Sequence, residues 1–107
     1  MRLLIIDDEP GVLRCLERVL ARHYDVTTTS SATAARILIA KRHYDAILCD
    51  VNMPGVKGTD FVGNLPPERA ARVVLMSGDA EAASGPVLPK PLVQRELLDT
   101  LDAIAAR

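Results

Sequence analysis

Three aspartates that are far apart in the sequence each follow an apolar run. Asp7 and Asp8 end the run LLII, and Asp50 ends the run AILC. If both runs are parallel strands of one sheet, their carboxyl ends meet at the same edge, where open α/β sheets place their ligands. The spacing therefore predicts a cluster of three carboxylates, which is suited to phosphoryl transfer.

Such a cluster favours a bound cation, because neighbouring carboxylates repel one another and stay ionised only when their charge is neutralised. The all-oxygen ligand set suits Mg²⁺, which binds one or two carboxylates, keeps several waters and completes its shell with substrate phosphate. Asp50 would then be the nucleophile, since a carboxylate can accept a phosphoryl group to form an acyl phosphate.

Two further polar residues follow predicted strands. Ser77 comes after RVVLM, and Lys90 comes after VLP. A hydroxyl and an ammonium could stabilise the charge on the equatorial oxygens of a transferring phosphoryl group. Lys90 would offer a point charge first to Asp50 and then to the phosphate. Taken singly, Ser77 could be a turn residue before Gly78, and an isolated lysine is usually a surface residue.

Short apolar runs alternate with amphipathic helical patterns, which is typical of βαβ units and a doubly wound parallel α/β sheet. The predicted strands are 3–6, 25–28, 46–49, 72–76 and 87–88, and the predicted helices are 10–23, 31–42, 59–65 and 92–106. Residues 50–58 are predicted to form a loop, and Ser30 or Ser31 to cap the second helix. Only twelve residues, 78–89, remain for a loop, a crossover and the fifth strand. The fourth helix should therefore be shortened to about 79–84 or missing.

Length and composition limit the possible functions. The 107 residues fit one domain, 1–107, and 49% apolar with 25% charged residues is ordinary for a globular protein. The net charge of −1 gives no electrostatic footprint for nucleic acid, so direct nucleic-acid binding is disfavoured. No apolar run is long enough to cross a bilayer, and the first residues lack the features of a signal peptide. We expect a cytoplasmic protein without membrane insertion.

The cysteines and histidines have ordinary structural interpretations. Cys15 and Cys49 fall in a predicted helix and a predicted strand, so we expect both to be buried apolar side chains rather than a disulfide. His23 and His43 each precede a Tyr-Asp pair at the end of a predicted helix, where a polar or cationic side chain is favourable. We expect neither histidine to bind a metal.

Four segments in chain order resemble a known family. IIDDEP, LCDVNMPG, LMSG and LPKP are similar to the motifs of the CheY-like receiver domain of two-component response regulators, and the likeness spans the whole chain. The resemblance implies a five-stranded parallel sheet in the order 2-1-3-4-5. It also implies a phosphorelay role, with a histidine kinase or phosphotransfer protein as the phosphodonor and Asp50 as the phosphoacceptor.

The resemblance also implies roles for the other site residues. Asp8 would bind Mg²⁺ directly, Asp7 through a metal-bound water, and Asn52 through its backbone carbonyl. Ser77 and Lys90 would contact the phosphoryl group. Such a domain modifies itself and turns over no external substrate. The sequence does not identify its downstream target.

Two departures from the family pattern bear on signalling. Val87 stands where most receivers carry a switch aromatic, and the segment 78–89 is contracted, which weakens the face that family members commonly use for output and dimerisation. We therefore expect a monomer or a weak dimer. Asn52 and Asp79 together resemble the faster-hydrolysing receivers, which predicts a short-lived phosphoform.

Two alternative functions stay open at this stage. The chain could be a receiver-fold interaction module that signals without phosphate, as the altered face would allow. It could also be a Mg²⁺-dependent phosphohydrolase with an aspartyl nucleophile, although that class generally needs a cap for substrate selection. The sequence leaves open whether this is a stand-alone regulator or part of a longer protein.

Overall fold

The fold is a five-stranded parallel sheet with helices on both faces. The computed structural model describes residues 1–53, 55–77, 87–90 and 92–107. The strands lie in the order β2-β1-β3-β6-β7, and every neighbouring pair is parallel. Their bounds are β1 Arg2–Ile6, β2 Asp25–Thr29, β3 Ala46–Asp50, β6 Val73–Ser77 and β7 Val87–Pro89. The predicted order 2-1-3-4-5 is confirmed, whereas the predicted helix 79–84, which includes Asp79, lies outside the described residues.

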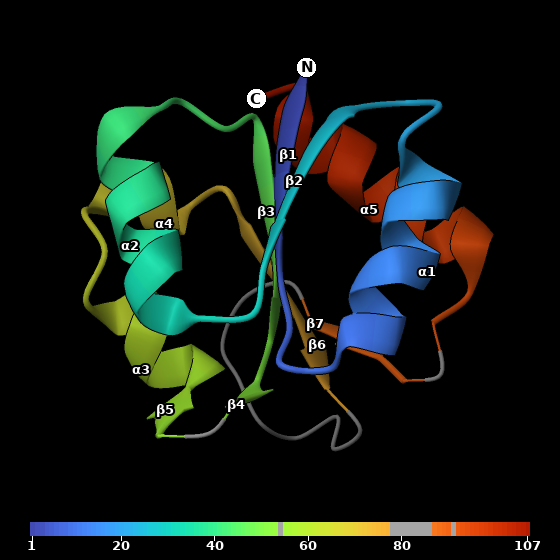
Figure 1. Ribbon diagram of the computed structural model, residues 1–107. Helices are drawn as coiled ribbons and strands as arrows, with labels where there is room; N and C mark the ends of the chain where they lie inside the picture. The colour runs from blue at the N-terminus through green and yellow to red at the C-terminus, as the bar shows by residue number, and fades with distance from the viewer. Residues whose placement is uncertain (54, 78–86, 91) are drawn as a thin grey trace.

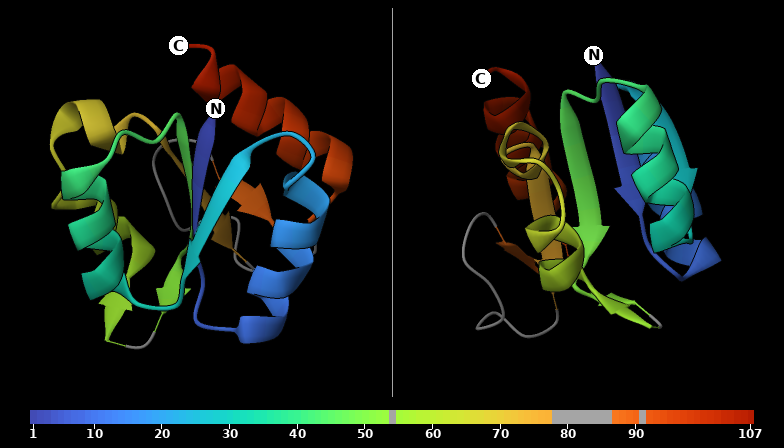
Figure 2. Two further views of the ribbon diagram at one scale, coloured as in Figure 1. Left: turned by 45° about the horizontal axis from the view of Figure 1, so that its top comes forward. Right: turned by 90° about the vertical axis from the view of Figure 1, so that its left-hand side faces the viewer.

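The helices form two layers that enclose the sheet. In Figure 1, α1 and α5 cover one face, and α2, α3 and α4 cover the other. The helices are α1 Pro10–Leu20, α2 Ala32–Lys41, α3 Gly58–Gly63, α4 Pro67–Ala70 and α5 Gln94–Ala105. The turned views in Figure 2 show the same layers. Both chain ends lie at the end of the sheet opposite the short strands β4 Asn52–Met53 and β5 Val56–Lys57. In the described part of the chain, no helix is both long and apolar enough to span a membrane.

The central strand β1 explains why its sequence is an unbroken apolar run. Successive side chains of a strand point to opposite faces, so a strand covered on both sides is apolar at every position. Leu3 and Ile5 belong to the core under α1 and α5, and Leu4 and Ile6 belong to the core under α2 and α3. All four side chains are fully buried. Because β1 lies inside the sheet, the residues that follow Ile6 lie near the middle of the end of the sheet where the strands have their carboxyl ends.

The edge strands and the helix cap follow their sequence signals. β2 is partly exposed along its length and lies at one edge of the sheet, and the short β7 lies at the other. Ser31 caps α2, because its side chain accepts a hydrogen bond from the backbone N–H of Ala34. A polar edge strand and a serine cap are both local signals, and both expectations are confirmed.

The connection after β3 is more ordered than the predicted loop. Asn52–Met53 and Val56–Lys57 form a two-stranded antiparallel hairpin, β4 and β5. Gly55 lies in its turn with a φ of 78°, a backbone conformation that glycine adopts without steric cost. After α3 the chain forms a single-turn helix that was not predicted, α4, which begins at Pro67. Proline suits the first helical position because its missing N–H would be unpaired there in any case.

The burial of one cysteine was predicted wrongly. Cys49 is buried in β3, but Cys15 is exposed on α1, and neither forms a disulfide. One helical position corresponds to about 100° of rotation, so the side chain next to the buried Leu16 can still face solvent. α1 ends at Leu20 and His23 lies in the turn that follows.

Gly58 is required by the close packing of α3 on β3. A Cβ atom at this position would lie 2.7 Å from the backbone oxygen of Asp50 and 2.8 Å from Cα of Val51. The N–H of Gly58 also donates a hydrogen bond of 2.6 Å to the oxygen of Val51. Only glycine allows the backbone after Asp50 to lie this close to the start of α3.

We predict that Gly58→Ala destabilises the fold by about 1–3 kcal/mol, since backbone atoms must move to admit the methyl group. Gly11→Ala is the matched control, because a Cβ at Gly11 in α1 meets nothing within 4 Å. That change should stabilise by about 0.4–1 kcal/mol through the lower entropy of the unfolded chain. Urea unfolding at equilibrium measures both, and equal stability of the Gly58 variant and the parent would contradict the packing argument.

Candidate functional site

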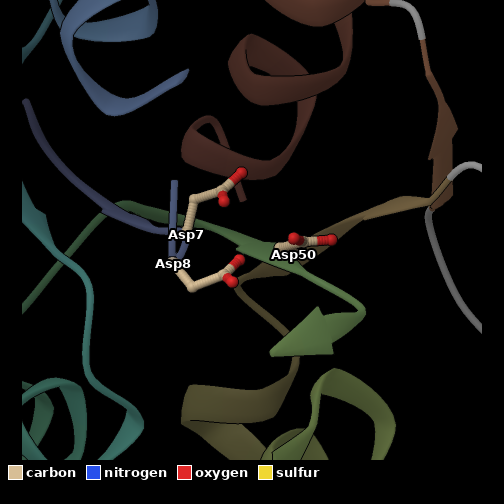
Figure 3. A group of neighbouring side chains, drawn as sticks. All are labelled: Asp7, Asp8 and Asp50. Atoms are coloured by element: carbon tan, nitrogen blue, oxygen red, sulfur yellow. The ribbon is translucent and has the colours of Figure 1, made fainter. Parts of the chain in front are cut away.

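The three predicted aspartates meet at the carboxyl ends of neighbouring strands. β1 pairs with β3 in the register Ile6 to Cys49, so Asp7 and Asp8 follow β1 beside Asp50, the last residue of β3. In Figure 3 the side chains of Asp7 and Asp8 extend toward the strand end that carries Asp50. One carboxylate oxygen from each residue lies within 4.8 Å of the other two. The strand-end argument therefore predicted the position of the cluster correctly.

Two of the three carboxylates are buried. Asp7 is 0% exposed and Asp50 is 5% exposed, whereas Asp8 is half-buried. Asp7 Oδ1 accepts a hydrogen bond of 3.0 Å from the backbone N–H of Glu9. Within the described residues, Asp7 Oδ2 is buried without a hydrogen-bond partner. A buried carboxylate oxygen without a partner is costly, so the cluster is suited to receive a positively charged group.

Lys90 is the cation that contacts this cluster. Its Nζ lies 3.4 Å from Asp50 Oδ1 and 3.8 Å from Asp7 Oδ2, at the range of ion pairs rather than of short hydrogen bonds. The lysine is held in place by its backbone N–H, which donates a hydrogen bond of 2.8 Å to the oxygen of Ser77. Among the residues that the structure describes, one ammonium faces three carboxylates, so the cluster keeps a negative excess.

Ser77 and Asn52 both lie next to Asp50. Ser77 ends β6, which pairs with β3 in the register Asp50 to Met76, and its side chain is buried. The backbone N–H of Asn52 donates a hydrogen bond of 3.3 Å to Asp50 Oδ1. The structure thus brings the predicted site residues Asp7, Asp8, Asp50, Asn52, Ser77 and Lys90 to one end of the sheet.

Burial controls the electrostatics of Asp7. Loss of solvation raises the pKa of its carboxyl above the ordinary value of 3.8, and the nearby charges of Asp50 and Asp8 raise it further. The hydrogen bond from the Glu9 N–H and the charge of Lys90 lower the same pKa but do not offset these effects. The site therefore opposes full ionisation of its own carboxylates.

Cys49, on the strand that carries Asp50, takes no part in this chemistry. Burial raises the pKa of its thiol to about 12, and the charges of Asp50 and Asp7 act in the same direction. Because the thiolate is the reactive form, this side chain is inert at neutral pH. Its role is to fill the core.

An open hollow of about 650 Å³ gives access to the cluster from the side of the hairpin. It is lined by Asp8, Asn52, Met53, Gly55, Val56, Lys57 and Asp60. Sequence reasoning missed Lys57 and Asp60 because the hairpin that positions the rim was interpreted as an irregular loop. It also missed the contribution of Glu9, whose backbone N–H, rather than its side chain, holds Asp7. No residue-type pattern marks a backbone donor of this kind.

Comparisons with known proteins find similarity over most of the chain. The sequence profile of the response regulator receiver domain matches residues 3–102. The chain is 36% identical over 86 residues to the two-component response regulator ARR11 of Arabidopsis thaliana, covering 78% of this chain and 16% of that protein. It is 33% identical over 109 residues to the hydrogenase transcriptional regulatory protein HoxA of Cupriavidus necator, covering 92% of this chain and 23% of that protein. The chain therefore spans less than a quarter of either relative.

A solved structure shows the same fold. The N-terminal signal receiver domain of a two-component system response regulator from Bacteroides fragilis is 25% identical and superposes with a TM-score of 0.84. The match covers 99% of this chain and 97% of that one. Sequence and structure comparisons thus agree along nearly the whole chain.

We predict that Asp7→Asn stabilises the metal-free protein at neutral pH. Since the folded-state pKa of Asp7 is raised, its contribution to stability is fully present below pH 3.8 and is lost as the pH rises through the folded pKa. The stability difference between variant and parent should therefore widen from about pH 4 toward pH 7, as measured by urea unfolding in EDTA.

Asp45→Asn supplies a control of opposite sign. The backbone N–H of Arg2 and the neighbouring His43 lower the pKa of Asp45 despite its partial burial. Its contribution to stability is present above pH 3.8 and is lost on acidification through the lowered pKa, so this variant should be less stable at neutral pH. A pH-independent difference for Asp7→Asn would show that its burial is not costly.

Proposed function

The chain belongs to the response regulator receiver domain family, and on this premise we propose that it accepts a phosphoryl group on Asp50. In the proposed step an oxygen of the Asp50 carboxylate attacks the phosphorus of a phosphohistidine. The P–N bond breaks, the imidazole leaves with the electron pair and takes up a proton, and an acyl phosphate forms on Asp50. The donor would be a histidine kinase or a phosphotransfer protein.

The observation that supports this step is the ion pair between Lys90 and Asp50. Nζ of Lys90 lies 3.4 Å from Asp50 Oδ1. At this distance the ammonium could pair first with the carboxylate and then with an oxygen of a phosphoryl group attached to it. The buried Ser77, whose backbone oxygen holds Lys90, would offer its hydroxyl to another phosphoryl oxygen. The N–H of Asn52 donates a hydrogen bond to Asp50 Oδ1 and helps to orient the carboxylate.

The donor set also fits Mg²⁺. Three carboxylate oxygens lie within 4.8 Å of one another, and the buried Asp7 Oδ2 has no hydrogen-bond partner among the described residues. Together they form an oxygen-rich site with a negative excess. Asp8 and Asp50 would bind the ion directly, Asp7 through water, and Asn52 through its backbone carbonyl. When bound, the ion would neutralise charge on the transferring phosphoryl group. The chain's own contribution is to hold three carboxylates together at the cost of their repulsion.

The consequence of phosphorylation would be a change in a partner-binding surface. At the position of the usual switch aromatic this chain has Val87, a partly buried side chain of the core beneath α2 and α3. A ring rotation cannot occur there. In the described part of the chain, the hydrogen bond from the Lys90 N–H to the Ser77 oxygen joins the ends of β6 and β7 and offers one connection from the site to the surface.

We predict that acetyl phosphate with Mg²⁺ adds one phosphoryl group to the protein, as seen by intact mass spectrometry. Asp50→Asn should abolish the addition, and omission of Mg²⁺ should reduce its rate at least tenfold, because the negative cluster then repels the donor. Lys90→Met is expected to slow labelling while leaving Asp50 as the modified residue. A wild-type protein that stays unmodified under all conditions would favour the phosphate-independent interaction module instead.

We also predict that Mg²⁺ stabilises the fold. A ligand that binds only the folded state at a hundredfold excess over its Kd adds about 2.7 kcal/mol to the free energy of unfolding. Asp8→Asn should remove most of this gain. Asp60→Asn is the matched control, since Asp60 lines the same hollow but lies outside the group of three carboxylates.

Urea unfolding with increasing MgCl₂, at constant ionic strength, measures the effect. Equal Mg²⁺-dependent gains in the Asp8 and Asp60 variants would argue against a site at the cluster.

A further inference from the structure

An apolar groove lies between α1 and α5, on the face of the sheet seen at the right of Figure 1. Its volume is about 390 Å³, and its apolar lining comes from Val12, Cys15, Leu16 and Val19 on the α1 side and from Leu92 and Leu97 on the α5 side. Glu9, Lys90 and Gln94 complete the lining. Val93, next to Leu92 in the chain, is 54% exposed. These side chains offer a patch of apolar surface that a packed partner would remove from water.

Three exposed arginines lie beside the groove, on α1 and in the turn that follows it. Arg14 and Arg18 are four residues apart in α1, which places them on one flank of the helix, and Arg22 lies in the turn after Leu20. Arg18 and Arg22 line a second hollow of about 270 Å³, which shares Val19 with the groove. Within the described ranges, none of these three guanidinium groups makes an ion pair or a hydrogen bond.

The α5 side is acidic. Glu96, Asp99 and Asp102 are exposed on α5, with Arg95 as the helix's one basic residue. Asp102 is oriented toward the α1 side, because it accepts a hydrogen bond from the hydroxyl of Tyr24. A basic and an acidic helix thus lie next to each other on one face of the molecule, with an apolar groove between them.

We propose that this face is a homodimer interface in which α1 of each protomer packs against α5 of the other. A two-fold axis passing between the helices places each basic flank against the partner's acidic helix and closes the apolar groove on both sides. A foreign helix of one charge would meet a like-charged row on one side of the groove. A second copy of the chain supplies both signs in the matching order, so charge complementarity selects it as the occupant.

The size of the face sets the expected affinity. Helices of 11 and 12 residues are roughly 16–18 Å long, so the face buries on the order of several hundred Å² per protomer. This is at the low end for specific interfaces. We therefore expect a reversible dimer that forms at micromolar concentrations and weakens with salt.

Charge reversal with complementary mixing tests the proposal. Sedimentation equilibrium of the full chain at low salt should show a concentration-dependent dimer. Arg18→Glu with Arg22→Glu should make one monomeric variant, and Glu96→Lys with Asp99→Lys a second; Asp102 is left unchanged because it pairs with Tyr24. An equimolar mixture of the two variants should regain the dimer, because their reversed charges are complementary.

The exposed Cys15 gives an independent readout in the same samples. It lines the groove from α1, while Cys49 is buried, so a short bismaleimide reacts at one site per chain. Covalent dimers should form in the parent and in the mixture, decrease at least fivefold in each variant alone, and be absent in Cys15→Ser.

Three results would overturn the proposal: a parent chain that is monomeric throughout the micromolar range, dimers that persist in both separate variants, or a folded mixture that stays monomeric. A parent chain that stays monomeric would indicate that a different protein occupies the groove. Circular dichroism of each variant establishes that it is folded. The test needs no phosphodonor, so its failure would leave the proposed role of Asp50 unaffected.

Discussion

Repulsion between buried carboxylates at the end of the central strands is the constraint that the rest of the site must accommodate. Asp7 and Asp50 are almost fully buried, and among the described residues they share one contacting cation, Lys90. Removing charge from water is expensive, and one ammonium does not balance the group. The fold can hold this arrangement because β1 and β3 lie between two apolar cores, whose burial stabilises the sheet independently of the site. The energetic cost is thus located where a bound cation can reduce it.

Several features around the cluster serve to keep it in place. The parallel register of β1 and β3 fixes the separation of the carboxylates, and the Glu9 and Asn52 N–H groups orient Asp7 and Asp50. The close packing at Gly58 holds the backbone after Asp50 against α3. Rigid positioning matters for phosphoryl transfer, since catalysis there rests on placement and electrostatic stabilisation.

The sequence predicts well what depends on local pattern and poorly what depends on tertiary packing. An unbroken apolar strand, a serine cap and a polar edge strand each carry a local signal, and strand ends then place Asp7, Asp8 and Asp50 together. Three features were missed. The strands of the β4–β5 hairpin and the single-turn helix α4 have only two to four residues each, too few to show a strand or helix periodicity. The exposure of Cys15 depends on its rotation about the α1 axis. The donors to the carboxylates were also missed, because every residue except proline carries a backbone N–H.

Lys90 connects the acidic cluster to the groove between α1 and α5. The same side chain that contacts Asp50 also lines the groove, and its backbone is bonded to Ser77 at the end of β6. A phosphoryl group on Asp50 would draw the ammonium toward new oxygens, and the groove wall formed by that side chain would change with it. Such a route needs no aromatic ring, which is consistent with Val87 in this chain. The strand end that holds the charge and the helical face that could meet a second copy are therefore joined through one residue.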